Sequence, residues 1–195
     1  IVSLTLRNNH FDYHGVQELA NSPYLKNLKS LNLMSNAVGD KGLLLLAESP
    51  NLSQLESLNL ENTGITSLGI LALSQSPHLT KLKELNLNSN DLGEKGFRIL
   101  ADSGNFKNLI KLKTSGVPVG DAGFQAIVKS NTLKQLEELE AMGNVITRKS
   151  LDSLVNSPIL SQLKKLDLRR NKLKDADLIF LADSPKFHNL EALRF

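Results

Sequence analysis

The sequence lacks cysteine, and this absence excludes disulfide bonds and thiolate metal sites. Long apolar runs are also missing: the longest, residues 42–47, is far shorter than the roughly 20 residues that a membrane-spanning helix needs. Neither sign of charge dominates, since 23 basic residues accompany 20 acidic ones and leave a net charge of +3. The charges are interspersed, so the sequence favours neither a membrane partner nor a nucleic-acid partner. With 195 residues, of which 41% are hydrophobic, the chain is long enough for a domain with a sizeable core.

A nine-residue motif recurs through the whole chain at a constant spacing of 27 residues, without insertion or deletion. Its pattern is Leu-x-x-Leu-x-Leu-x-x-Asn, as in residues 28–36. Seven repeats begin at residues 1, 28, 55, 82, 109, 136 and 163, and the first strand of an eighth begins at residue 190. The regularity predicts a single domain over residues 1–195, in which each repeat stacks on its neighbours.

Each repeat combines a strand pattern with a helix pattern. In residues 31–33, two leucines flank an asparagine, so a short strand directs both leucines inward. Leu43, Leu46 and Ala47 follow the spacing of one buried helix face, and a Ser-Pro pair or a close variant ends the repeat. We therefore expect strands around residues 4–6, 31–33, 58–60, 85–87, 112–114, 139–141, 166–168 and 193–195.

This pattern resembles the leucine-rich repeat (LRR) family over the full length of the chain, and helix-bearing repeats of this length are similar to its ribonuclease-inhibitor-like class. The resemblance implies an α/β fold: a right-handed solenoid, or horseshoe, with a parallel concave sheet and outer helices. It also implies a protein–protein interaction module without catalysis of its own. The regular unit closed by Ser-Pro is similar to bacterial members of the family.

The asparagine that ends the motif is expected to be structural, because a buried amide can satisfy backbone groups of its own and the neighbouring repeat. It occurs as Asn9, Asn36, Asn90, Asn144 and Asn171. Thr63 and Val117 interrupt this column; a threonine can keep part of the bonding and a valine cannot. Thr114 and Ala141 replace inward leucines, which indicates either a local packing variation or a shallow dip in the concave surface.

The chain starts and stops inside a motif, and no capping repeat is visible at either end. A bare end of a solenoid exposes a cross-section of its core. We therefore expect the sequence to be a fragment of a longer chain, or its uncapped ends to pack on other material, such as a second copy through self-association.

The sequence contains no pattern typical of an active site. His10, Asp12 and His14 are the closest grouping of possible metal ligands, but they occupy a strand-to-helix turn, and a solvated turn explains them better than zinc does. Phosphate-binding glycine loops, nucleophile elbows and paired carboxylates are not found. We predict no catalytic residue, no cofactor and no metal.

Binding residues are expected where the repeats differ from one another. The middle strand position is a row of asparagines in the N-terminal half of the concave face and becomes varied and charged in the C-terminal half. The candidate protein-binding residues of the concave face are Lys111, Lys113, Glu138, Glu140, Met142, Asp167, Arg169, Arg170 and Arg194. Opposite charges at this spacing either neutralise each other across adjacent strands or form a mixed-charge groove for a protein partner, with Met142 as an apolar contact.

Two alternative functions rest on the resemblance alone. One is the LRR domain of a translocated bacterial effector; the other is a GTPase-activating type of regulator, for which Arg169, Arg170 and Arg194 are the candidate arginines. We expect a cytoplasmic location, or the host cytosol if the protein is a secreted effector.

Overall fold

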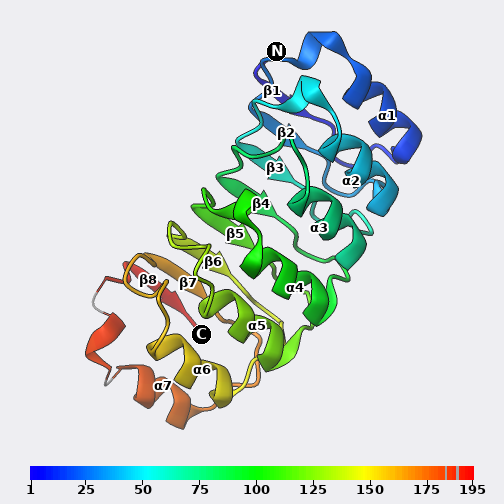
Figure 1. The fold of residues 1–195 in the computed structure, drawn as a ribbon. Helices are drawn as coiled ribbons and strands as arrows, with labels where there is room; N and C mark the ends of the chain where they lie inside the picture. The colour runs from blue at the N-terminus through cyan, green and yellow to red at the C-terminus, as the bar shows by residue number, and fades with distance from the viewer. Residues whose placement is uncertain (183, 188) are drawn as a thin grey trace.

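The structure is a computed structural model that describes residues 1–182, 184–187 and 189–195. Short parallel strands form one sheet whose order follows the sequence from β1 to β8 (Figure 1). The strands are β1 (Ser3–Thr5), β2 (Ser30–Asn32), β3 (Ser57–Asn59), β4 (Glu84–Asn86), β5 (Lys111–Lys113), β6 (Glu138–Glu140), β7 (Lys165–Asp167) and β8 (Ala192–Arg194). Every residue of a strand pairs with the residue 27 positions later, so the register of the sheet equals the period of the sequence.

One helix follows each of the first seven strands, and the helices line up along one side of the sheet (Figure 1). They are α1 (Tyr13–Asn21), α2 (Gly39–Ala47), α3 (Ser67–Ser74), α4 (Gly93–Asp102), α5 (Gly120–Val128), α6 (Arg148–Val155) and α7 (Asp175–Ala182). Short 3-10 turns follow four of them: η1 (Pro23–Leu25), η2 (Pro50–Leu52), η3 (Gly104–Phe106) and η4 (Pro185–Phe187). The result is the predicted α/β solenoid of 27-residue repeats.

A continuous hydrophobic core runs between the sheet and the helices. Leu31 and Leu33 point into it from the strand side, and Leu43 and Leu46 meet them from α2; all four are buried. The same positions are filled in repeat after repeat, so each repeat covers the apolar side of its neighbour.

The predicted strands lie one residue too late, since β2, for example, covers Ser30–Asn32 rather than 31–33. Side-chain alternation marks the inward residues, whereas pairing depends on backbone hydrogen bonds, and these already include the bond from Ser30 N to Val2 O at 3.1 Å. The bonds also continue past the strand, because Leu33 N donates to Asn59 O at 2.9 Å.

In repeats two to six, the serine of the closing Ser-Pro pair or its variant ties the repeat to the one before it. Ser49 Oγ donates to the carbonyl oxygen of Ala20, and Ser76 Oγ donates to that of Ala47, both at 2.5 Å. These carbonyls belong to the end of the preceding repeat's helix, where no intrahelical partner is available. Sequence reasoning assigned the proline its role in ending the helix but missed this role of the serine.

The asparagine column is structural, as predicted. Asn90 Oδ1 accepts hydrogen bonds from the backbone N–H groups of Thr63 and Ile65, at 3.1 and 3.0 Å. Its Nδ2 donates to the carbonyl oxygens of Leu60 and Leu87, at 2.7 and 3.0 Å. One buried amide thus satisfies backbone groups of two repeats.

The two interruptions of the column also behave as expected. Thr63 Oγ1 donates to Leu60 O at 2.6 Å and so keeps part of the bonding, whereas Val117 has no polar side-chain atom to offer. Thr114 and Ala141 are completely buried, and Thr114 Oγ1 donates to Glu140 O at 3.1 Å. Their burial favours the local packing variation over a surface dip.

Large apolar side chains are exposed at both ends of the sheet. Ile1 and Val2 are exposed beside β1, and Leu193 and Phe195 are exposed at β8. Self-association through these ends stays a prediction. Within the described ranges, no helix has the length and apolar character that a membrane crossing requires.

We expect Asn90→Ala to lower the free energy of unfolding by about 2–4 kcal/mol, because several buried backbone groups lose their partner at once. Asn9→Ala is the matched control: Asn9 occupies the same column but is exposed, and its Nδ2 bonds only to Leu6 O and Arg7 O of its own repeat. Urea unfolding of both variants measures the difference. Equal losses for the two would contradict the structural role of the buried amide.

Candidate functional site

The candidate site lies on the strand face, which we define as the side of the sheet away from the helices, formed by the first and third residues of each strand. In its N-terminal half, the third position is asparagine in β2, β3 and β4. Asn32 Oδ1 accepts a hydrogen bond from Met34 N and Asn59 Oδ1 accepts one from Glu61 N, both at 3.0 Å. These amides are fixed by their own strand ends, and they make the third strand position of this half a uniform, uncharged row.

The C-terminal half of the strand face brings together most of the predicted binding residues. Six of the nine lie on four neighbouring strands: Lys111, Lys113, Glu138, Glu140, Asp167 and Arg194. The pairing register places Lys111 beside Glu138 and Lys113 beside Glu140. Residues 27 positions apart in the sequence are therefore immediate neighbours on this surface.

The first strand position carries a row of paired charges. Glu138 accepts from Lys111 Nζ at 2.7 Å and from Lys165 Nζ at 2.6 Å, so a single carboxylate lies between two ammonium groups. The hydrogen bond from Lys111, followed by that from Lys165, lowers the pKa of Glu138 from its ordinary 4.5 to about 2. Conversely, the hydrogen bond to Glu138 raises the pKa of Lys111.

The third strand position carries a second set of pairs. Lys113 Nζ lies 2.9 Å from Glu140 Oε1. Asp167 is buried and accepts from the guanidinium of Arg169 at 2.6 to 3.1 Å, which holds the pKa of Asp167 below its ordinary value. Arg194 approaches the same carboxylate less closely, at 3.8 Å. The interpretation that opposite charges neutralise each other across adjacent strands is thus confirmed for Lys113 with Glu140 and for Arg194 with Asp167. Arg169 instead pairs with Asp167 within the same repeat.

Met142 and Arg170 lie outside this network. Met142 is half-buried just after β6, and its backbone N–H donates to Ser115 Oγ at 3.2 Å. Arg170 is exposed in a turn with a φ of 56°. Among the described contacts, none joins either side chain to the charged pairs, so both are neighbours of the network rather than members of it.

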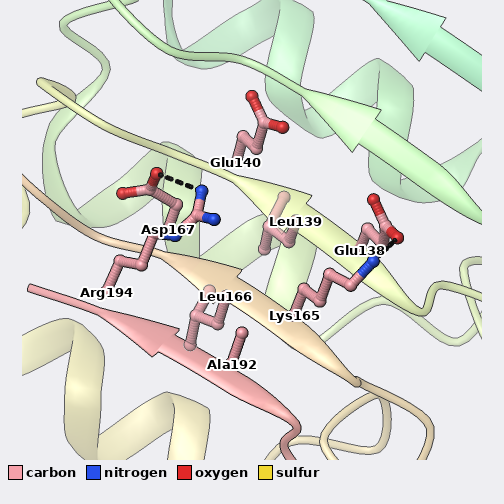
Figure 2. A pocket seen from close by; sticks show the side chains of 8 residues that line it. All are labelled: Glu138, Leu139, Glu140, Lys165, Leu166, Asp167, Ala192 and Arg194. Carbon is pink, nitrogen blue, oxygen red and sulfur yellow. Dashed lines mark hydrogen bonds and ion pairs between the residues drawn. The ribbon is translucent and has the colours of Figure 1, made fainter.

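A shallow depression of about 40 Å³ opens on the strand face between β6, β7 and β8. Figure 2 shows its lining: Glu138, Leu139, Glu140, Lys165, Leu166, Asp167, Ala192 and Arg194. The floor includes buried leucines, and the rim is charged except at Ala192. The depression lies nearer the C-terminus than the dip considered at Thr114 and Ala141.

Sequence reasoning missed Lys165 and Ala192. Both occupy the first position of a strand, in the same column as Lys111 and Glu138. Following this column through every repeat, beyond Lys111 and Glu138, is the signal that would have found them. A further charged rim was also missed: Glu56 lies between Lys29 and Lys83, at 3.2 and 2.6 Å, and Glu137 pairs with Lys164 at 2.8 Å.

The histidine grouping near the N-terminus has a simple local explanation. His14 Nδ1 lies 3.1 Å from Asp12 Oδ2, and Asp12 caps α1 by accepting from His14 N. In the part of the chain that the structure describes, no cluster of three or more histidine or acidic side chains could hold a metal ion. The arrangement therefore forms a helix start on the surface.

Comparisons with known proteins agree with the repeat architecture. A family model described as "Leucine Rich repeat" matches residues 24–47, 78–98 and 161–182. Internalin C2 from Listeria monocytogenes is similar in structure over 100% of this chain and 81% of its own, with a TM-score of 0.61 and 21% identity. A second internalin from the same organism matches 99% of this chain and 53% of its own, with a TM-score of 0.61 and 19% identity. The TM-scores show a shared fold, and at such low identities they show the fold alone. A search of curated proteins gives no match.

The pairing of Glu138 generates a prediction about pH. The folded-state pKa of about 2 lies below the ordinary 4.5, so the carboxylate stabilises the fold above about pH 5 and loses this contribution as the pH falls towards 2. We expect Glu138→Gln to lower the free energy of unfolding at pH 7 by about 1 kcal/mol, after allowance for solvent screening. The difference in the free energy of unfolding between wild type and Glu138→Gln should shrink steadily as the pH falls from 5 to 2.

Urea unfolding of both proteins across this range measures the effect. Glu18→Gln serves as a control, since Glu18 is exposed on α1 and no ion pair involving it occurs among the described residues. A deficit that stays constant with pH would show that the ion pairs of Glu138 do not cause it.

Proposed function

Since the chain is a leucine-rich repeat protein, we propose that it acts as a protein-interaction module and has no catalytic activity of its own. We propose the C-terminal half of the strand face as the binding surface, centred on β5 to β8. One observation carries this assignment: charged side chains that vary from repeat to repeat lie side by side on one continuous surface, next to a depression. The uniform asparagine half lacks this variety.

The rigidity of the scaffold supports the proposal. The strands are held by an in-register hydrogen-bond ladder, and the surface side chains are held by their ion pairs. A partner therefore meets a preformed surface and loses little free energy to ordering it. The partner's own charges must match the pattern of the pairs, which favours specificity and rapid association over very tight binding. The face also offers few aromatic anchors, which agrees with moderate affinity.

A comparative pulldown tests the proposed surface. The baits are wild type and a variant in which Lys113, Glu140, Asp167 and Arg169 are all changed to serine. The substitutions remove both members of two ion pairs, so no charge of these pairs is left unpaired and the fold should persist. We expect a protein that wild type captures to be reduced at least about tenfold with the variant, as detected by quantitative mass spectrometry.

The matched control changes Lys29, Glu56 and Lys83 to serine, which removes a complete ion-pair group at the start of β2, β3 and β4. This control should capture the same protein as wild type. Equal capture by all three baits would contradict the C-terminal strand face and direct the search to the outer helices or the ends of the sheet.

The regulator and effector alternatives stay predictions. A GTPase-activating role requires an arginine or polar group that reaches a bound nucleotide, and Arg194 is an exposed arginine in the lining of the depression. Incubation of the purified chain with a panel of small GTPases tests this alternative. If GTP hydrolysis is not accelerated, the regulator role is wrong and the interaction module remains as the proposed function. The bacterial origin of both similar structures agrees with a bacterial source. We propose action in the cytoplasm, or in the host cytosol for an effector.

A further inference from the structure

The first position of successive strands carries alternating charges that stop at Ala192. From β4 to β8 the column reads Glu84, Lys111, Glu138, Lys165 and Ala192. An interior member of the column has an opposite charge on each side, as Glu138 has in Lys111 and Lys165. Continuation of the alternation would place an acidic residue at the position of Ala192.

Lys165 is left with a partner on one side only. Its ammonium lies 2.6 Å from Glu138, which it shares with Lys111, and on its other side the register places the methyl group of Ala192. The side chain of Lys165 is 53% exposed, compared with 30% for Lys111. Part of the hydrogen-bonding capacity of this ammonium is therefore open to solvent.

Arg194 is a second cation with an incomplete partner. Its guanidinium is 3.8 Å from Asp167, a carboxylate that already accepts the closer hydrogen bonds of Arg169. The side chain of Arg194 is 62% exposed. Figure 2 shows Lys165 on β7 and Arg194 on β8 at opposite sides of the depression, with Ala192 on the same strand as Arg194.

The surrounding carboxylates do not complete the pairing of Lys165 and Arg194, because each of them already has a closer or additional partner. Glu140 is paired with Lys113, Asp167 is bonded to Arg169, and Glu138 is shared by two lysines. Five cations thus surround three carboxylates in this part of the strand face, and a fourth carboxylate, that of Glu84, lies at the far end of the column. Lys165 and Arg194 have the most exposed side chains of these five cations, and both lie beside Ala192, whose side chain is small.

We propose that the depression over Ala192 is a subsite for an acidic side chain, aspartate or glutamate, of a protein partner. The carboxylate takes the place that the alternation leaves open and accepts hydrogen bonds from Lys165 Nζ and the guanidinium of Arg194. Such charge-assisted bonds are short and strong, and a guanidinium can hold a carboxylate through two of them. The inference rests on the proposed binding function and adds the chemistry that the partner must present.

A peptide titration tests the subsite without the natural partner. The probes are two blocked hexapeptides, one of alternating serine and glutamate and one of alternating serine and glutamine, added to the full chain labelled with ¹⁵N. We expect the glutamate peptide to shift the amide signals of Lys165, Ala192 and Arg194 saturably, with a Kd on the order of 1 mM, and the glutamine peptide to leave them unchanged. About 0.5 M salt should weaken the binding.

Ala192→Glu provides the decisive variant, because it supplies the missing carboxylate from the chain itself. It should weaken binding of the glutamate peptide by about tenfold and raise the thermal midpoint by ~1–3 °C. Ser30→Glu is the matched control: it introduces the same residue at the same strand position in β2, between Ser3 and Ser57, and should do neither. The melting curves also show directly whether each variant is folded.

Three results would overturn the subsite: equal shifts from both peptides, shifts centred on another part of the strand face, or unchanged peptide affinity in Ala192→Glu. Each of these results can be distinguished from a failure of the proposed binding function. If capture in the pulldown depends on the strand face but the chain does not bind the glutamate peptide, the strand face is still a binding surface. Only its proposed preference for an acidic side chain is then wrong.

Discussion

The repeat length equals the offset between paired residues in the sheet, and the arrangement of the core and of the surface follows from this equality. Because each strand residue pairs with the residue 27 positions later, any residue type that recurs in the sequence becomes a column in space. Leucine columns form the core, and the serine and asparagine columns satisfy backbone groups that the helices and turns leave unpaired. A residue inserted within a strand would move the side chains that follow it in that strand out of their columns.

The same constraint organises the charges of the strand face. A lysine and a glutamate one repeat apart become neighbours within hydrogen-bond distance, as Lys111 and Glu138 do. An alternating column is nearly neutral along its length, so recognition depends on the places where the alternation changes. At Ala192 the change leaves both a space and two cations, Lys165 and Arg194, whose partners are shared. We regard such interruptions as the informative positions of a solenoid surface.

Stability and recognition therefore reside in different layers of the same repeat. Buried polar columns such as that of Asn90 hold backbone groups that water cannot reach, and their loss is costly. Ion pairs on the strand face are partly solvated, and each contributes little to folding. The strand face can thus differ from repeat to repeat without affecting the core, which is what a binding surface on a fixed scaffold requires.

The repeat, the order of strand and helix, the inward leucines, the structural asparagines and the charged C-terminal half of the strand face can all be predicted from the amino-acid sequence. These features follow from periodicity, which records where a residue lies within its own repeat. The pairing partner of each charge, the role of Ser49 and its equivalents, the first residue of each strand and the depression over Ala192 become visible in the folded structure alone. These depend on the reach and size of side chains in adjacent repeats: Lys165 bonds to Glu138 because its flexible stem spans the gap between strands, and the depression exists because the methyl group of Ala192 does not fill it.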